Sequence, residues 1–131
     1  MGSPAKILVV DDDPIVCQSC QGILAADGHE VSTALTGDEA MRKIQSERFD
    51  VALLDLRIPG SGGLRLLRAI RKASPQTEVV MMTGYPSIEN AKGSIGLGAV
   101  DYVSKPLVPE TLRRVIGQAL LSKSWAIQER C

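Results

Sequence analysis

Short apolar runs alternate along the chain with longer stretches in which apolar residues recur at helical spacing. Four of the five runs are nearly continuous Val, Ile, Leu, Met and Ala, which is typical of strands buried on both faces of a parallel sheet. The predicted strands are residues 6–10, 30–34, 51–54, 78–82 and 100–103. The predicted helices are residues 14–26, 37–47, 63–73, 87–97 and 109–121. This alternation predicts an α/β fold in which helices cover both faces of an open sheet.

Local signals mark the helix starts and the domain limits. Asp13 before Pro14 is typical of an N-cap with proline in the first turn, and Thr36 opens a capping-box pattern. Residues 1–4 resemble an expression-vector remnant, and residues 5–121 are expected to form one domain. After Leu121 the apolar pattern fades, so residues 122–131 are expected to be a helical extension or a linker.

Composition narrows the class of protein. A chain of 131 residues fits one domain, and its 3% aromatic content predicts an aliphatic core. Fifteen Lys and Arg balance fifteen Asp and Glu, which argues against a stand-alone nucleic-acid binder because such proteins need a basic face. No apolar run approaches the ~18 residues of a membrane span. We therefore expect a cytoplasmic protein with no membrane contact.

Two cysteines, Cys17 and Cys20, form a CxxC pair that could in principle be redox-active or half of a metal site. A second ligand pair is missing, and both residues fall inside a predicted helix rather than at a strand-to-helix turn. We interpret them as ordinary helix positions. The only histidine is His29, which makes a Ser-His-Asp or Cys-His catalytic site improbable.

Polar and charged residues follow four of the five predicted strands. Because ligands of open parallel sheets bind beyond the carboxyl ends of the strands, we expect these side chains to lie close together. They are Asp11, Asp12 and Asp13 after the first strand, Asp55 after the third, Thr83 after the fourth, and Ser104, Lys105 and Pro106 after the fifth.

A cluster of this kind points to phosphoryl chemistry. Asp11, Asp12 and Asp55 would repel one another unless a hard cation relieved the repulsion, and Mg²⁺ prefers one or two carboxylates together with a phosphate. Lys105 adds a positive charge and Thr83 a hydroxyl donor, both of which suit the oxygens of a phosphoryl group. An aspartate can itself be the nucleophile, and Asp55 is the best candidate because the residues after it do not start a helix.

Four stretches of the sequence resemble the receiver domains of two-component response regulators. The stretches are ILVVDDD at 7–13, LLDLRIPG at 53–60, MTGY at 82–85 and GAVDYVSKP at 98–106. The resemblance covers about residues 5–121. It implies a flavodoxin-like, doubly wound sheet of five parallel strands in the order 2-1-3-4-5, with five helices.

The resemblance also implies a role for each matching residue. Asp55 would be the phosphoacceptor, and Lys105 would bridge it and the phosphoryl group. Thr83 would hydrogen-bond a phosphoryl oxygen, and Tyr102 would swing inward in step with it. Mg²⁺, or Mn²⁺ in its place, would be held by Asp12, Asp55 and the backbone carbonyl of Arg57, with Asp11 acting through water. The Lys105–Pro106 peptide would be cis, an isomer that is accessible mainly before proline.

The function implied by the resemblance is a signalling switch rather than an enzyme. The phosphoryl donor would be a sensor histidine kinase, a phosphotransfer protein or a small acyl phosphate. Phosphorylation would remodel the face formed by residues 87–97, 100–103 and 109–121, and so control an output domain, a partner or a second copy of the chain. The stretch from 82 to 106 resembles transcription activators of the family. This domain itself is not expected to bind nucleic acid.

Three other functions compete with this interpretation. A phosphohydrolase of the haloacid-dehalogenase type would use Asp11 and Asp13 as a DxD motif, although such enzymes are usually longer. A pseudo-receiver would keep the fold but take no phosphate, yet every residue that the chemistry needs is present. A flavin-binding protein would need a glycine loop after the first strand, where the chain has three aspartates.

Overall fold

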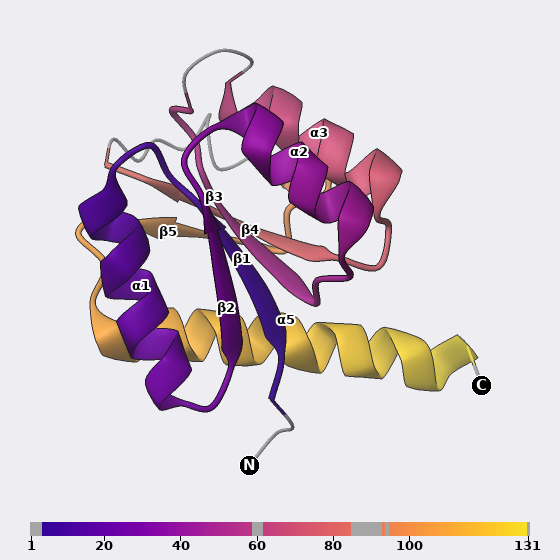
Figure 1. Cartoon of the computed structure of the whole chain (residues 1–131). Helices are drawn as coiled ribbons and strands as arrows, with labels where there is room; N and C mark the ends of the chain where they lie inside the picture. Colours follow the sequence, from indigo (N-terminus) through magenta and orange to yellow (C-terminus); the bar gives the residue numbers. More distant parts are fainter. Residues whose placement is uncertain (1–3, 59–61, 85–92, 94, 131) are drawn as a thin grey trace.

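Five parallel strands form a single sheet in the order β2-β1-β3-β4-β5 (Figure 1). The computed structural model describes residues 4–58, 62–84, 93 and 95–130, with side chains as far as residue 121. The strands are β1 (Lys6–Val10), β2 (Glu30–Ala34), β3 (Val51–Asp55), β4 (Glu78–Thr83) and β5 (Asp101–Ser104). The predicted strand order is therefore confirmed.

The described part of the chain contains four helices, not the five that were expected. They are α1 (Pro14–Ala26), α2 (Gly37–Ser46), α3 (Gly63–Ala73) and α5 (Pro109–Arg130). The helix expected over 87–97 lies largely outside the described residues. Where it is described, Gly93 and residues 95–96 are helical, and the Leu97 amide donates to the Gly93 carbonyl at 3.1 Å.

The helices cover the two faces of the sheet in pairs, α1 with α5 and α2 with α3 (Figure 1). Successive strand residues point to opposite faces. Ile7 and Val9 of β1 therefore join the core beneath α1 and α5, and Leu8 and Val10 join the core beneath α2 and α3. All four are fully buried, which explains the continuous apolar run in the sequence.

Strands β3, β4 and β5 each end one residue later than predicted. Asp55 is the last residue of β3 and pairs with Met82, and Thr83 is the last residue of β4 and pairs with Ser104. The pairing continues past the apolar run because the backbone ladder does not depend on side-chain polarity. Asp55 and Thr83 are thus held by the sheet itself rather than by a loop.

The predicted caps are present. The Asp13 carboxylate accepts a hydrogen bond from the Ile15 amide at 2.9 Å, and the Thr36 hydroxyl accepts one from the Glu39 amide at 3.1 Å. The backbone of residues 122–130 continues α5 as a helix. No helix among the described residues combines the length and the apolar character that crossing a membrane requires.

The CxxC pair belongs to the core. Cys17 and Cys20 are free, buried thiols on the inner side of α1. Burial raises the pKa of Cys17 above its ordinary value and that of Cys20 to about 12. A reactive or metal-binding thiol needs a low pKa and access to solvent, so the structural interpretation of this pair holds.

Candidate functional site

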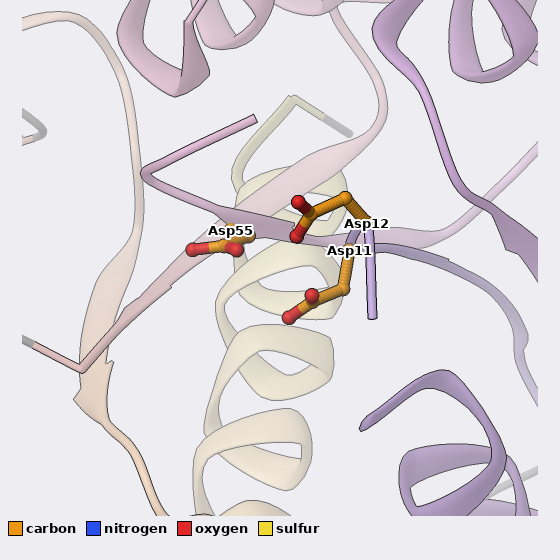
Figure 2. Close-up of side chains that lie close together, drawn as sticks. All are labelled: Asp11, Asp12 and Asp55. Carbon is orange, nitrogen blue, oxygen red and sulfur yellow. The ribbon is translucent and has the colours of Figure 1, made fainter. Parts of the chain in front are cut away.

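Three carboxylates meet at the carboxyl edge of the sheet, and Figure 2 shows them side by side. Asp11 and Asp12 directly follow β1, and Asp55 ends β3, the strand that pairs with β1. One carboxylate oxygen from each residue lies within 4.8 Å of the other two. The parallel order of the strands thus brings together residues that are distant in the sequence.

Lys105 completes the cluster from the other side. Its Nζ lies 2.6 Å from Asp11 Oδ2 and 3.2 Å from Asp55 Oδ2. The Lys105 backbone amide donates to the Thr83 carbonyl at 2.7 Å, and the Lys105–Pro106 peptide is cis. One cation is therefore shared between two carboxylates.

The second oxygen of each buried carboxylate is held by the backbone. Asp11 Oδ1 accepts from the Asp13 amide at 2.9 Å, and Asp55 Oδ1 accepts from the Arg57 amide at 3.1 Å. These bonds leave the Oδ2 atoms of both residues facing Lys105. The carboxylates are thus fixed in orientation before any ligand arrives.

Burial sets the electrostatics of the site. Asp11 is fully buried and Asp55 is 5% exposed, whereas Asp12 is exposed. Burial raises the pKa of Asp11, against the opposing effect of its hydrogen bond from Lys105. Burial also disfavours the charged form of Lys105, but its bonds to Asp11 and Asp55 outweigh that effect and raise its pKa. The lysine therefore stays cationic among the carboxylates.

The donor set fits a hard divalent cation. All three side chains offer carboxylate oxygens, which are the ligands that Mg²⁺ and Mn²⁺ prefer. Asp12 is exposed and gives such an ion a path from solvent. Arg57, whose carbonyl was expected to be a ligand, lies on the loop that leaves Asp55.

Thr83 and Tyr102 flank the cluster. Thr83 is 1% exposed at the end of β4, beside β3. Tyr102 packs against the apolar core beneath α2 and α3. Its hydroxyl is buried and has no hydrogen-bond partner among the described residues. The structure thus gathers Asp11, Asp12, Asp55 and Lys105 into one cluster, with Thr83 on the neighbouring strand. Tyr102 lies on β5 and packs against the apolar core.

Sequence reasoning missed the part played by Gly63, the first residue of α3. A Cβ atom there would lie 2.5 Å from the Asp55 carbonyl oxygen and 2.6 Å from Leu56 Cα, both backbone atoms. The start of α3 therefore lies directly against the residue that carries the site. The available signal was the pair of glycines, Gly62 and Gly63, that opens the predicted helix after the buried strand.

Comparison with known proteins now adds to this geometry. The model of the response regulator receiver domain family matches residues 7–117. The chain belongs to this family. Receiver domains are signalling domains of two-component systems and bind Mg²⁺ at an acidic pocket, which the three carboxylates form here. In the phosphohydrolase alternative, Asp13 would be the second acid of the DxD motif, but here Asp13 is the N-cap of α1.

Transcriptional regulatory proteins are among the curated relatives of this receiver domain. ZraR of Klebsiella oxytoca is 35% identical over 119 residues, which is 91% of this chain and 27% of the relative. GlrR of Escherichia coli is 32% identical over 127 residues, 97% of this chain and 29% of the relative. The chain thus spans little more than a quarter of the length of these relatives.

Solved structures agree on the fold. A CheY-like receiver domain protein from Methanospirillum hungatei is 37% identical with a TM-score of 0.89, and the match covers 95% of this chain and 99% of that one. NtrX from Brucella abortus is 35% identical with a TM-score of 0.93, and the match covers 98% of this chain and 29% of that one. The receiver domain therefore resembles both a single-domain protein and one part of a longer regulator.

Proposed function

We propose that this receiver domain accepts a phosphoryl group on Asp55 in a Mg²⁺-dependent reaction and thereby controls an output domain or partner in transcription regulation. The observation that carries the proposal is the arrangement of Asp55 Oδ2. This oxygen lies on the Lys105 ammonium at 3.2 Å, within a cluster of three carboxylates. Such a site concentrates negative charge on one side and a fixed cation on the other.

The reaction begins with Asp55 Oδ2 as the nucleophile. It attacks the phosphorus of a phosphohistidine on a sensor histidine kinase or phosphotransfer protein, or of a small acyl phosphate. The new O–P bond forms as the P–N bond, or the P–O bond of an acyl phosphate, breaks. The departing imidazole takes up a proton, and a departing carboxylate needs none. The phosphoryl group ends on Asp55 as an aspartyl phosphate.

The chain's own residues orient and stabilise this transfer. The Arg57 amide holds Asp55 Oδ1, so that Oδ2 is presented to the donor. Lys105 would bridge Asp55 and the incoming phosphoryl oxygens, a role that suits a cation held beside the reacting oxygen. Asp12, Asp55 and the Arg57 carbonyl, with Asp11 acting through water, would hold Mg²⁺, which would supply positive charge that offsets the carboxylates and the phosphoryl oxygens.

The switch follows from the same contacts. Thr83 would hydrogen-bond a phosphoryl oxygen, and Tyr102 would change its packing in step. A partnerless buried hydroxyl is costly, which supports a second position for the Tyr102 side chain. The readout surface would be the face of β5 and α5 together with residues 87–97. A hollow of about 500 Å³ between β5 and α5 offers room there for a partner or a second copy of the chain.

Intact-protein mass spectrometry after incubation with acetyl phosphate tests the proposal. The wild-type chain should gain one phosphoryl group with Mg²⁺ and none with a chelator. Asp55→Asn should gain none. Asp13→Asn is the matched control: asparagine also caps helices, and Asp13 lies outside the cluster, so labelling should persist. An unlabelled wild-type chain with an intact fold, or a labelled Asp55→Asn, would refute the proposal and favour the pseudo-receiver.

A further inference from the structure

Charged residues are distributed unevenly over the helices. The sequence of α1 contains no charged residue, whereas α2 and α3 together contain six Lys or Arg and only two acidic residues, Asp38 and Glu39. The six cationic residues are Arg42, Lys43, Arg65, Arg68, Arg71 and Lys72. The zero net charge of the whole chain hides this local excess.

Three of these cations form a stripe on α3. The helix buries Gly63, Leu66, Leu67 and Ile70. Arg65, Arg68 and Lys72 are spaced three and four residues apart, which places them on one side of the helix, and all three are exposed. The stripe points away from the buried side.

A fourth exposed cation, Arg42, lies on α2, the helix that packs beside α3 (Figure 1). We call the three residues of the α3 stripe the cationic face: Arg65, Arg68 and Lys72.

The cationic face is not used by the fold. Lys43 and Arg71 of the same two helices donate to the carbonyls of Thr33 and Thr77. By contrast, none of the three residues of the face makes an ion pair or a side-chain hydrogen bond within the described part of the chain. Their charges are therefore available to a ligand.

Local electrostatics on α3 are unfavourable. Like charges three or four residues apart destabilise a helix, and this applies to Arg68 with both Arg65 and Lys72. Arg65 also lies in the first turn, where the helix dipole disfavours a cation. The cap residue, Gly62, offers no side-chain hydrogen bond in compensation. Lys72 lies in the last turn, where the dipole favours a cation, so the electrostatic cost falls on Arg65 and Arg68.

The surroundings of the face indicate its ligand. Protein interfaces usually centre on apolar or aromatic side chains, and sites for single-stranded nucleic acids use aromatic side chains to stack bases. The described exposed large apolar residues lie off α2 and α3; they are Ile15, Leu35, Ile95, Val108 and Leu121. What remains is arginine-rich positive charge, which matches phosphate oxygens well.

The zero net charge led us to expect no contact with nucleic acid, but that argument concerns the whole chain and not one local surface. We propose, against that expectation, that the cationic face contacts the phosphate backbone of double-stranded DNA without regard to base sequence. The distance from Arg65 to Lys72 along the helix is about 10 Å, over which one DNA strand carries about three phosphates. The contact is weak and salt-sensitive, and it adds to the DNA affinity of any segment or partner that recognises the base sequence. It goes beyond the proposed phosphoryl transfer and does not depend on it.

Fluorescence anisotropy of labelled duplexes tests the contact. Two short duplexes of unrelated sequence should bind the chain equally well. The affinity should fall by about 40-fold between 50 and 200 mM NaCl, the slope expected for about three phosphate contacts. Arg65→Gln/Arg68→Gln should lose roughly tenfold or more in DNA affinity at low salt. The slope of the logarithm of the binding constant against the logarithm of the salt concentration should change from about −2.7 in the wild type to about −0.9 in this variant.

The matched control is Arg113→Gln/Arg114→Gln, which removes two arginines from α5 and changes the net charge equally. This control should bind like the wild type, and Asp55→Asn should bind DNA unchanged, which separates this contact from the phosphoryl chemistry. Three results would overturn the proposal. The first is no DNA binding at low salt, and the second is an equal loss of DNA affinity in both double variants. The third is that the chain binds a poly-glutamate peptide instead of DNA, and that Arg65→Gln/Arg68→Gln weakens this binding. The last result would assign the face to an acidic protein.

Discussion

Replacing Gly63 with alanine should destabilise the protein, although alanine is the better helix former. The new Cβ would lie 2.5–2.6 Å from the Asp55 carbonyl oxygen and from Leu56 Cα and its carbonyl oxygen, where ordinary contact begins at 3.4 Å. All three are backbone atoms, so no side chain can rotate away. The start of α3 must retreat from β3 by most of an ångström.

The magnitude follows from two opposing effects. Overpacking of this kind costs about 1–3 kcal/mol, and the rigid backbone at this site favours the upper part of that range. Alanine recovers up to about 1 kcal/mol through helix propensity. We expect a net loss of about 1–2 kcal/mol, which lowers the melting temperature by about 4 °C per kcal/mol in a domain of this size.

Gly22→Ala provides the matched control, because Gly22 lies inside α1 and a Cβ there would meet nothing within 4 Å. This variant should be stabilised by about 0.5–1 kcal/mol. Urea and thermal unfolding of both variants and the wild type show whether each substitution raises or lowers the free energy of unfolding. If Gly63→Ala is as stable as the wild type or gains stability like Gly22→Ala, then the close approach of α3 to β3 does not limit this fold.

Two further outcomes follow from other parts of the structure. Cys20 has a pKa of about 12 in the fold but about 8.5 when unfolded, so above pH 8.5 the unfolded state releases a proton that the native state keeps. The free energy of unfolding should therefore fall as pH rises, and Cys20 should account for about 2 kcal/mol of that fall by pH 10. In urea unfolding, Cys20→Ala should lack this contribution. If the wild type and Cys20→Ala lose stability equally as pH rises, the assignment to Cys20 is wrong. Thr36→Ala should lose about 1 kcal/mol of unfolding free energy because it removes the α2 cap, whereas Thr36→Ser should be nearly as stable as the wild type. If the two variants are equally stable in urea, the cap contributes nothing.

The fold followed from sequence patterns wherever one signal dominated. The apolar runs of β1 and β3 predicted doubly buried strands because helices cover both faces of the sheet. Asp13 and Thr36 predicted helix starts because their side chains satisfy free backbone amides. Strand ends were predicted less well, since backbone pairing carries β3 and β4 on through Asp55 and Thr83.

The candidate site was predictable in its members but not in its geometry. Asp11, Asp55 and Lys105 stood out because each lies at the end of a predicted strand. The sharing of one ammonium between two buried carboxylates depends on the register of β1 against β3, which no local pattern encodes. The same limit hid Gly63, which is required by a distance between backbone atoms. The cationic face could be read from the spacing of Arg65, Arg68 and Lys72, but the lack of ion-pair partners for these residues could not.

The bond between Lys105 and Asp11 joins positions 94 residues apart in the chain. Contacts at such separation are slow to form, because closing a long loop costs entropy. A nascent chain that has not yet delivered residue 105 therefore lacks the bridging ammonium, however well its first three strands have formed. Under the proposed phosphoryl transfer, copies that end before residue 105 should take up no phosphoryl group, so that only a completed domain responds.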